Sequence, residues 1–294
     1  MMDIANYLKS QSQLVEQQLD QLIPVSHGPY QHLFEAARYA LLGSGKRLRP
    51  ILTLATNQML GGSSSAALIP ACTLELIHTY SMIHDDLPCM DDDDYRRGKL
   101  TVHRKYSEGH AVLTGDFLLT YAFEVLSTAP HLTPEKKIKL ISTLARQSGG
   151  EGMIGGQVMD LSFEGKKISL DSLRLLHRNK TAALLTAAVE FGGIIADATD
   201  AQLNCLRHFG ENIGLAFQVI DDILDVTSSQ TKHGRSIASD VLNEKSTYVS
   251  LMGLEQAQAC ALNFYQQALQ ALKPLPFDTS LLINISDFIL KRQH

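Results

Sequence analysis

Residues 204–226 read NCLRHFGENIGLAFQVIDDILDV, and their apolar side chains recur with the three- to four-residue spacing of an α-helix. Gln218, Asp221, Asp222 and Asp225 stand at positions i, i+3, i+4 and i+7 and therefore share one helical face. A helix that is otherwise apolar but carries one polar stripe more often lines a cavity than faces bulk water. We therefore expect this stretch to be a buried helix that presents amide and carboxylate groups to a cavity.

The same periodicity dominates the rest of the chain. We expect further amphipathic helices over residues 8–22, 66–83 and 277–290. Strict alternation of β-branched residues is missing, as are the Asn-Gly and Asp-Gly turns typical of hairpins. Breakers such as residues 61–65 and 273–276 separate the helical segments, but none is long enough to link two domains. The sequence predicts one all-α domain over residues 1–294, a helical bundle.

Composition excludes several classes of protein. The 294 residues include 26 Lys and Arg against 31 Asp and Glu, a net charge of −5, which removes the usual electrostatic reason to expect a nucleic-acid partner. The four cysteines are far apart in the sequence and indicate neither a disulfide framework nor a zinc site. The N-terminus is polar, and the apolar stretch 181–198 is too short and too interrupted for a membrane span. We expect a cytoplasmic protein with no integral membrane segment.

A first acidic cluster lies in residues 84–97, which read HDDLPCMDDDDYRR. Two carboxylates about 4 Å apart repel each other by about 4 kcal/mol at an effective dielectric constant near 20. Divalent cations relieve this repulsion, and a set of oxygen ligands suits magnesium. Pro88 should kink or end the preceding helix after Leu87, which allows Asp85 and Asp91 to face one cavity. A solvated acidic helix end is the alternative, but the second cluster at Asp221–Asp225 makes it much weaker.

Basic residues accompany both clusters. Residues 43–50, GSGKRLRP, form a Gly-containing basic turn that is not a P-loop, in which Arg47 and Arg49 can bind phosphate bidentately. Arg96 and Arg97 follow the acidic run directly. Together with the paired carboxylates, these cations predict a site for two anionic substrates, one bound through metal and one bound by cations directly.

Several motifs, taken in order, resemble those of short-chain, head-to-tail (trans) prenyl diphosphate synthases, and the chain is most similar to the bacterial farnesyl diphosphate synthases of that family. The resemblance runs from about Gly43 to Tyr248. The matching segments are GSGKRLRP (43–50), ELIH (75–78), HDD-x4-D-x4-RRG (84–98), GGQ-x2-DL (155–161), KT (180–181), FQ-x2-DD-x2-D (217–225) and KSTY (245–248). No single motif is specific, but their order and joint presence are.

The resemblance implies an isoprenoid-synthase bundle around a deep apolar pocket, a homodimer and three Mg²⁺ ions. It implies that Asp85 and Asp91 ligate two of the metals and Asp221 the third, supported by Asp86, Asp222 and Asp225. It further implies two sets of diphosphate-binding residues: Arg96, Lys180 and Lys245 for an allylic diphosphate, and Lys46, Arg49, His78 and Arg97 for isopentenyl diphosphate. Lys180, Thr181 and Gln218 would stabilise a carbocation during the reaction.

The segment 227–245 departs from the family pattern. We expect it to form a mobile flap, in which Arg235 would contact substrate. Arg235 replaces the family's lysine there and keeps the charge with a different geometry. Ala238 and Glu244 replace glycines, and Glu244 adds a negative charge near a diphosphate. These differences bear on closure of the flap and not on the core chemistry.

Product length in such enzymes depends on residues about one helical turn before the first aspartate cluster, here Tyr80 and Ser81. A bulky Tyr80, with the extra residues Pro88 and Cys89 in the acidic loop, resembles farnesyl-forming enzymes. Ordinary aromatic packing in the core is the alternative role for Tyr80, so a geranyl or geranylgeranyl product stays open.

Three other functions share part of the pattern. A class I terpene cyclase would want Asn/Asp-x2-Ser/Thr-x3-Glu as its second metal site, where this chain has DD-x2-D. A phosphohydrolase of the His-Asp type would need further histidines in a matching pattern. A non-catalytic regulatory partner subunit is the non-enzyme alternative, and intact aspartates in both clusters argue against it.

Overall fold

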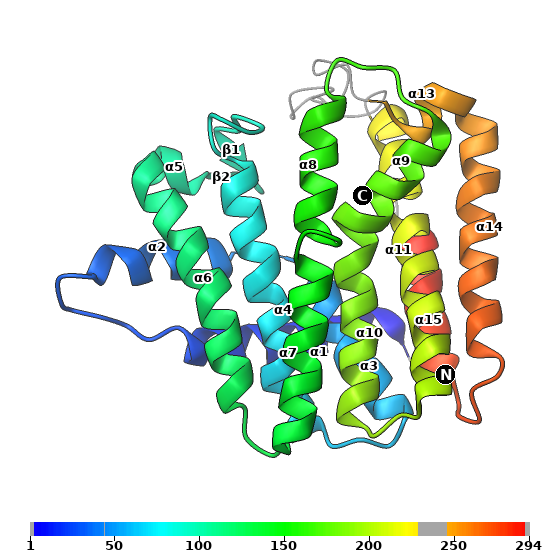
Figure 1. Ribbon diagram of the computed structural model, residues 1–294, viewed down its shortest axis with the longest axis horizontal. Helices are drawn as coiled ribbons and strands as arrows, with labels where there is room; N and C mark the ends of the chain where they lie inside the picture. The colour runs from blue at the N-terminus through cyan, green and yellow to red at the C-terminus, as the bar shows by residue number, and fades with distance from the viewer. Residues whose placement is uncertain (1–2, 44, 229–245, 292–294) are drawn as a thin grey trace. The chain divides into compact units, whose positions relative to one another are not determined.

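The computed structural model describes residues 3–43, 45–228 and 246–291, which are almost entirely helical (Figure 1). The chain divides into two compact units, Met1–Ser142 with Ile194–Ala196 and Thr143–Gly193 with Asp197–His294. The all-α prediction is confirmed. One domain over residues 1–294 stays a prediction, and most of the expected flap at 227–245 lies outside the described residues.

Among the described residues, six helices lie within the first unit, and a seventh, α7 (Pro134–Ser148), begins in the first unit and ends in the second. The six are α1 (Ile4–Leu22), α2 (Gln31–Leu41), α3 (Leu48–Met59), α4 (Ser64–Asp85), α5 (Val102–Lys105) and α6 (Glu108–Thr128). The second unit contains α8 (Met153–Phe163), α9 (Leu170–His177), the π-helical turn η1 (Arg178–Ala182), α10 (Ala183–Ile195, whose last residues group with the first unit), α11 (Asp200–Ser228), α13 (Tyr248–Met252), α14 (Leu254–Leu272) and α15 (Ser280–Leu290).

The predicted helices are present with shifted ends. The expected helices over residues 66–83 and 204–226 fall within α4 and α11, which are longer by a few residues at each end. The last helix begins at Ser280 and not at Phe277, because the Asp278 side chain accepts a hydrogen bond from the Ser280 backbone N–H (3.0 Å) and forms a turn first. Such local competition by a side chain is difficult to predict from periodicity alone.

One short hairpin corrects the expectation that β structure is missing. Strand β1 (Tyr95–Arg96) pairs antiparallel with β2 (Lys99–Leu100), with Arg96 opposite Lys99. The connecting residues Arg97 and Gly98 both have positive φ (53° and 75°), as a two-residue type I′ turn requires. Arg-Gly therefore replaces the usual Asn-Gly, and the hairpin places Arg96 and Arg97 next to the acidic loop.

The core of the first unit is built around α4, which packs along α3 and α6. Nearly every side of α4 is buried between residues 66 and 77. The helix is long and apolar enough to cross a membrane by length and composition, but 72% of its apolar window is buried inside the structure. This is the environment of a core helix, and it holds the acidic loop at the C-terminal end of α4 on a rigid support.

The core of the second unit lies where α11 and α14 pack side by side. Its buried cluster contains Leu215, Val219, Tyr248 and Phe264. Glu190 interrupts the apolar helix α10 and is itself buried, where it accepts hydrogen bonds from Gln147 (3.1 Å) and Arg207. The buried carboxylate is thus paired, as burial of a charge requires.

Candidate active site

The acidic loop of the first unit folds back onto the end of α4. The helix ends at Asp85, before Pro88, and Asp86 caps it. The backbone N–H of Asp91 then donates to the carbonyl of Asp85 (2.8 Å), and the N–H of Asp92 donates to the carbonyl of Leu87 (3.1 Å). The break at Pro88 therefore returns the chain to the helix end and brings the backbones of Asp85 and Asp91 together. That their side chains face one cavity stays a prediction.

Asp86 in this loop is buried and ion-paired. Its carboxylate bonds to Arg96, and Arg96 also contacts Asp93 (3.3 Å). Burial raises the pKa of Asp86 to about 6, although the Arg96 guanidinium lowers it. Asp86 is thus ionised at pH 7, and the pair holds the β-hairpin against the end of α4.

In the basic segment before α3, the neighbouring cations Lys46 and Arg47 lie in different environments. Lys46 is exposed, whereas the side chain of Arg47 is 1% exposed. Arg47 donates to Glu75 (2.7 Å) and to the carbonyls of Leu41 and Gly43. The expectation that Arg47 can bind phosphate is therefore wrong in this structure, because its guanidinium is turned into the core.

His78 and the arginines after the acidic run do come together. His78, Asp86, Arg96 and Arg97 line one small cavity of about 70 Å³ together with Lys99. Burial and the neighbouring arginines, Arg49 first, hold the pKa of His78 well below 6.5, so its ring is neutral at pH 7. A neutral imidazole next to arginines donates one N–H to an anion without adding charge. Lys46 and Arg49 are not among the lining residues of this cavity.

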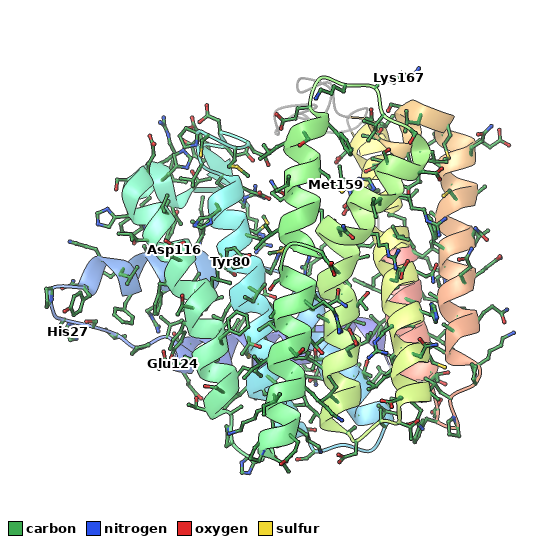
Figure 2. All side chains as sticks on the ribbon, viewed as in Figure 1. His27, Tyr80, Asp116, Glu124, Met159 and Lys167 are labelled. Atoms are coloured by element: carbon green, nitrogen blue, oxygen red, sulfur yellow. The ribbon has the colours of Figure 1, made fainter. Side chains whose placement is uncertain are left out.

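Tyr80 and Ser81 lie near the end of α4, and Figure 2 labels Tyr80. The Tyr80 ring is 5% exposed and packs edge-on against His84, with ring centroids 5.8 Å apart. Its hydroxyl is buried with no hydrogen-bond partner among the described residues. His84 in turn contacts the carbonyl of Val112 (3.1 Å). Ser81 donates to the backbone carbonyl of His78 (2.9 Å).

The second unit carries the other half of the predicted residues. Lys180, Gln218 and Asp222 line a cavity of about 110 Å³ together with Asp160 and His177. Thr181 donates to Gln218 (2.9 Å), and Gln218 donates to Asp222 (3.2 Å). Two residues of the predicted polar stripe of α11, Gln218 and Asp222, therefore line a cavity, and the amide of Gln218 is fixed between a hydroxyl and a carboxylate.

Asp222 also fixes the chain that follows the undescribed segment. It is buried and accepts a hydrogen bond from the backbone N–H of Tyr248 (2.8 Å). Tyr248 belongs to the buried cluster of this unit. This arrangement suits the supporting role expected for Asp222, while Asp221 and Asp225 lie on the more exposed part of the stripe.

A π-helical turn presents Lys180 and Thr181. The turn η1 (Arg178–Ala182) lies between Gly156 of α8 and Gly214 of α11. A Cβ at Gly156 would lie 2.2 Å from the backbone N of Lys180, and a Cβ at Gly214 would lie 2.5 Å from the Cβ of Ala182. Only glycine permits this approach, and π-helical turns are frequent at functional sites.

Two site residues were assigned no role from the sequence. Asp160 accepts from Lys180 (2.6 Å), and it stands in a motif that the sequence analysis did match. His177 lines the same cavity, and burial lowers its pKa to about 3. Its position one turn before Lys180 is the only signal in the sequence, because burial of a histidine depends on tertiary packing. Arg235 and Lys245 lie outside the described residues.

The carboxylates suit magnesium only when a bound phosphate supplies further oxygen ligands. Within the described ranges, no group of three or more His, Cys, Asp or Glu side chains is arranged to hold a metal ion. Magnesium usually takes one or two protein carboxylates and completes its shell with water and substrate phosphate oxygens. Asp85 with Asp91, brought together by the loop, and Asp221 with Asp225, one helical turn apart, provide such oxygen sets. These two pairs of carboxylates would hold magnesium.

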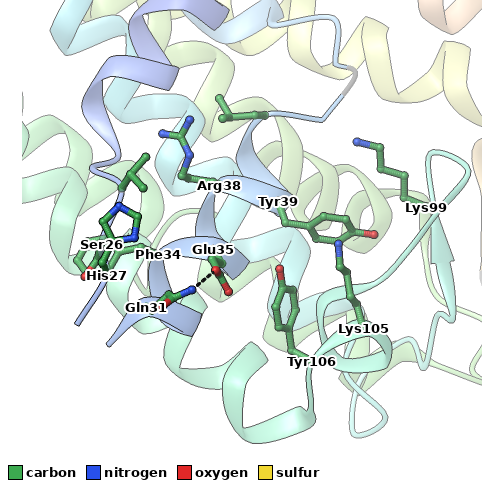
Figure 3. Close-up of a pocket in the computed structure, with 12 residues that line it drawn as sticks. Ser26, His27, Gln31, Phe34, Glu35, Arg38, Tyr39, Lys99, Lys105 and Tyr106 are labelled. Atoms are coloured by element: carbon green, nitrogen blue, oxygen red, sulfur yellow. Dashed lines mark hydrogen bonds between the residues drawn. The ribbon is translucent and has the colours of Figure 1, made fainter. Parts of the chain in front are cut away.

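A larger cavity, of about 480 Å³, also lies in the first unit and shares Tyr39 and Lys99 with the small cavity at His78 (Figure 3). It is lined by the segment before α2, by α2 itself and by Lys99, Lys105 and Tyr106. Lys105 lies over the Tyr39 ring, 3.6 Å from its centroid. None of the predicted site residues lines this cavity, so cavity size alone does not locate the chemistry.

Comparison with known proteins agrees with the pattern of residues. A family model described as polyprenyl synthetase matches residues 30–274. The chain is 47% identical over 263 residues to a farnesyl diphosphate synthase of Haemophilus influenzae (89% of each chain), and 43% identical over 296 residues to a geranylgeranyl diphosphate synthase of Cyanophora paradoxa (99% of this chain, 97% of the relative). The structure of an FPP/GFPP synthase from Zymomonas mobilis superposes with a TM-score of 0.88 at 36% identity, covering 98% of this chain and 99% of the other.

Proposed function

Since the chain belongs to the polyprenyl synthetase family of magnesium-dependent prenyltransferases and is a head-to-tail prenyl diphosphate synthase, we propose that its product is farnesyl diphosphate. It would extend dimethylallyl diphosphate to geranyl diphosphate and then to farnesyl diphosphate, adding one isopentenyl diphosphate at each step. The observation that carries the farnesyl product is the buried ring of Tyr80 near the end of α4. For the prenyl transfer itself, each unit combines carboxylates with a paired cation, Asp86 with Arg96 and Asp160 with Lys180.

The two substrates are bound by different chemistry. Arg96, Lys180 and Lys245 would bind the diphosphate of the allylic substrate. Asp85 and Asp91 in the first unit and Asp221 in the second would hold magnesium, which supplies positive charge next to a diphosphate. Lys46, Arg49, His78 and Arg97 bind isopentenyl diphosphate without metal. The neutral ring of His78 supports this assignment, because a neutral donor binds phosphate without adding to the repulsion among the arginines.

The reaction follows from the charges. Bound magnesium supplies positive charge that stabilises the departing pyrophosphate. The allylic C–O bond breaks, the π bond of isopentenyl diphosphate attacks the resulting carbocation, and a new C–C bond forms. A proton then passes to the released pyrophosphate, which restores the double bond. Thr181 and Gln218, fixed in one hydrogen-bonded chain, and the backbone of Lys180 direct dipoles toward the cation.

Tyr80 supports the farnesyl product. Its bulky ring is buried in α4, near the end of the helix that carries the first carboxylates, where it would stop a growing tail. A geranylgeranyl product is the second candidate, and the similarity to the Cyanophora paradoxa enzyme favours it. The length of the alcohol released from the product distinguishes the two.

We also propose that the enzyme is a homodimer and acts in the cytoplasm. The alternative, a non-catalytic partner subunit, would have the same fold but would not turn over substrate. The carboxylates of both motifs argue for turnover, so the assay below also decides this alternative.

The test is a product assay with purified protein, Mg²⁺ and isopentenyl diphosphate, with dimethylallyl or geranyl diphosphate as primer. The expected main product is farnesyl diphosphate from both primers, abolished in Asp85→Ala and in Asp221→Ala. Glu124→Gln and Glu255→Gln, exposed carboxylates in the first and second units, are the matched controls and should retain activity. A folded protein that elongates neither primer would refute the proposal.

A further inference from the structure

Arg47 and Glu75 form a buried ion pair beneath the basic segment. Their side chains are 1% and 4% exposed, and Arg47 Nη1 lies 2.7 Å from Glu75 Oε1. The same guanidinium donates through Nη2 to the carbonyls of Leu41 (2.7 Å) and Gly43 (2.6 Å). The pair therefore ties α4, which carries Glu75, to the end of α2 and to the turn that leads into α3.

The backbone of Arg47 has an unusual conformation. Its φ of 49° and ψ of 33° place it in the left-handed region as the N-cap of α3, which a long side chain rarely adopts. Such conformations persist where surrounding contacts over-determine them, and they cluster at functional sites. Arg47 is therefore buried between two neighbours in the sequence that differ from it. Lys46 before it is exposed, and Arg49 after it lies in the first turn of α3.

Glu75 also faces the other cations of this region. Its negative charge acts on both Arg49 and Arg97 as well as on Arg47. Arg49 Nε is buried with no hydrogen-bond partner in the part of the chain that the structure describes. A Cβ at Gly45 would lie 2.9 Å from Arg97 Nη1 and 3.3 Å from Arg47 Nη1, so both arginines lie against the bare backbone of the turn. One carboxylate thus organises three arginines around a segment with a buried, unbonded N–H.

We propose that Arg47 and Glu75 are a positioning pair for isopentenyl diphosphate: they do not touch it, but they hold residues 45–50 so that Lys46 and Arg49 bind its diphosphate. The inference rests on the proposed function of this site. Stability alone does not account for the pair, since a buried ion pair is often no more stabilising than apolar residues of similar volume.

A substitution that removes a charge changes the affinity for isopentenyl diphosphate in opposite directions under positioning and under simple electrostatics. Glu75→Gln removes a negative charge near the diphosphate, so electrostatics alone would tighten the binding of isopentenyl diphosphate. Loss of positioning would weaken it instead. The double variant Arg47→Met/Glu75→Leu removes one charge of each sign, leaves the net charge of the region unchanged and replaces the pair by apolar side chains.

Binding of isopentenyl diphosphate is measured by calorimetry without Mg²⁺, and KM for each substrate is measured with it, alongside the melting temperature. Both variants should bind isopentenyl diphosphate roughly tenfold or more weakly and raise its KM equally, because small misplacements of binding groups carry costs of this size. KM for geranyl diphosphate should stay within about twofold. Glu16→Gln is the matched control, because Glu16 is the exposed and more distant partner of Arg47 (3.6 Å).

Tighter or unchanged binding in Glu75→Gln, or equal losses for both substrates that follow the melting temperature, would overturn the positioning role. A wild-type protein that elongates no primer would instead refute the proposed function, and calorimetry on the wild type would still report whether isopentenyl diphosphate binds.

Discussion

At the scale of single residues, neighbours in the sequence have opposite environments. Lys46 is exposed and Arg47 is buried, and the backbone of Arg47 accounts for the difference. Residue type and spacing predict that both Arg47 and Arg49 can bind phosphate, because they do not reveal the left-handed φ of Arg47. A metal-binding role for the aspartates was easier to predict, because so many carboxylates close together repel each other unless cations bind them.

Buried histidines should make the protein sensitive to acid. Burial lowers the pKa of His177 to about 3, so the folded state binds fewer protons than the unfolded state below pH 6.5. Stability from this group is complete above pH 6.5 and falls as the pH drops toward 3, by up to about 1.4 kcal/mol per pH unit. His78 acts in the same direction.

The test compares urea unfolding of the wild type and His177→Phe at pH 7.5 and pH 5. Phenylalanine keeps the ring that packs against Tyr248, 5.5 Å between centroids. We expect the variant to lose less stability between the two pH values than the wild type does. Parallel losses would show that His177 does not carry this sensitivity.

Tyr80 should control product length through its size. Tyr80→Ala is expected to shift the product from farnesyl toward geranylgeranyl diphosphate, measured by chromatography of the dephosphorylated alcohols. Tyr80→Phe is the control: the hydroxyl has no hydrogen-bond partner among the described residues, so its removal should leave product and stability nearly unchanged. An unchanged product in Tyr80→Ala would leave Tyr80 a packing residue only.

At the scale of elements, periodicity predicted the long helices but not the irregular ones. α4 and α11 follow from apolar spacing, and the end of α4 follows from Pro88. The π-helical turn η1 and the Arg-Gly hairpin do not, because each depends on tertiary contacts or on a turn that several sequences can adopt. Both irregular elements carry predicted site residues.

The tight packing of η1 provides a direct test of its role. Gly214→Ala would place a Cβ 2.5 Å from the Cβ of Ala182, so the turn that carries Lys180 and Thr181 must move. We expect a loss of roughly 1–3 kcal/mol in stability and a lower kcat. Gly109→Ala is the control, because nothing lies within 4 Å of its Cβ and alanine favours helix. Full activity in Gly214→Ala would show that the geometry of η1 is not critical.

At the scale of the whole molecule, the predicted site residues are distributed over both compact units. The first supplies Asp85, Asp91 and the arginines, and the second supplies Lys180 and the stripe of α11. The chemistry of these groups already associates them in the sequence, although more than eighty residues separate Arg97 from Lys180. It did not reveal which side chains pair within each unit, such as Asp160 with Lys180, because those pairs depend on packing.

Metal binding should depend on a diphosphate. No group of three or more His, Cys, Asp or Glu side chains in the described ranges is arranged to hold a metal ion, so Mg²⁺ alone is expected to change the melting temperature little. Mg²⁺ together with pyrophosphate should raise it by several degrees, because both bind the folded state. Asp85→Ala should remove most of this additional shift, and Glu124→Gln should keep it. A full shift with Mg²⁺ alone would contradict this dependence.

Prenyl transfer that requires both sets of carboxylates is best tested by the stoichiometry of pyrophosphate release and isopentenyl diphosphate consumption. Wild-type protein is incubated with Mg²⁺, geranyl diphosphate and isopentenyl diphosphate, and the pyrophosphate released is compared with the isopentenyl diphosphate consumed. We expect one pyrophosphate released for each isopentenyl diphosphate consumed, with farnesyl diphosphate formed at the same rate, and neither release nor consumption in Asp85→Ala or Asp221→Ala. Release of pyrophosphate without consumption of isopentenyl diphosphate, or full turnover in either variant, would contradict it.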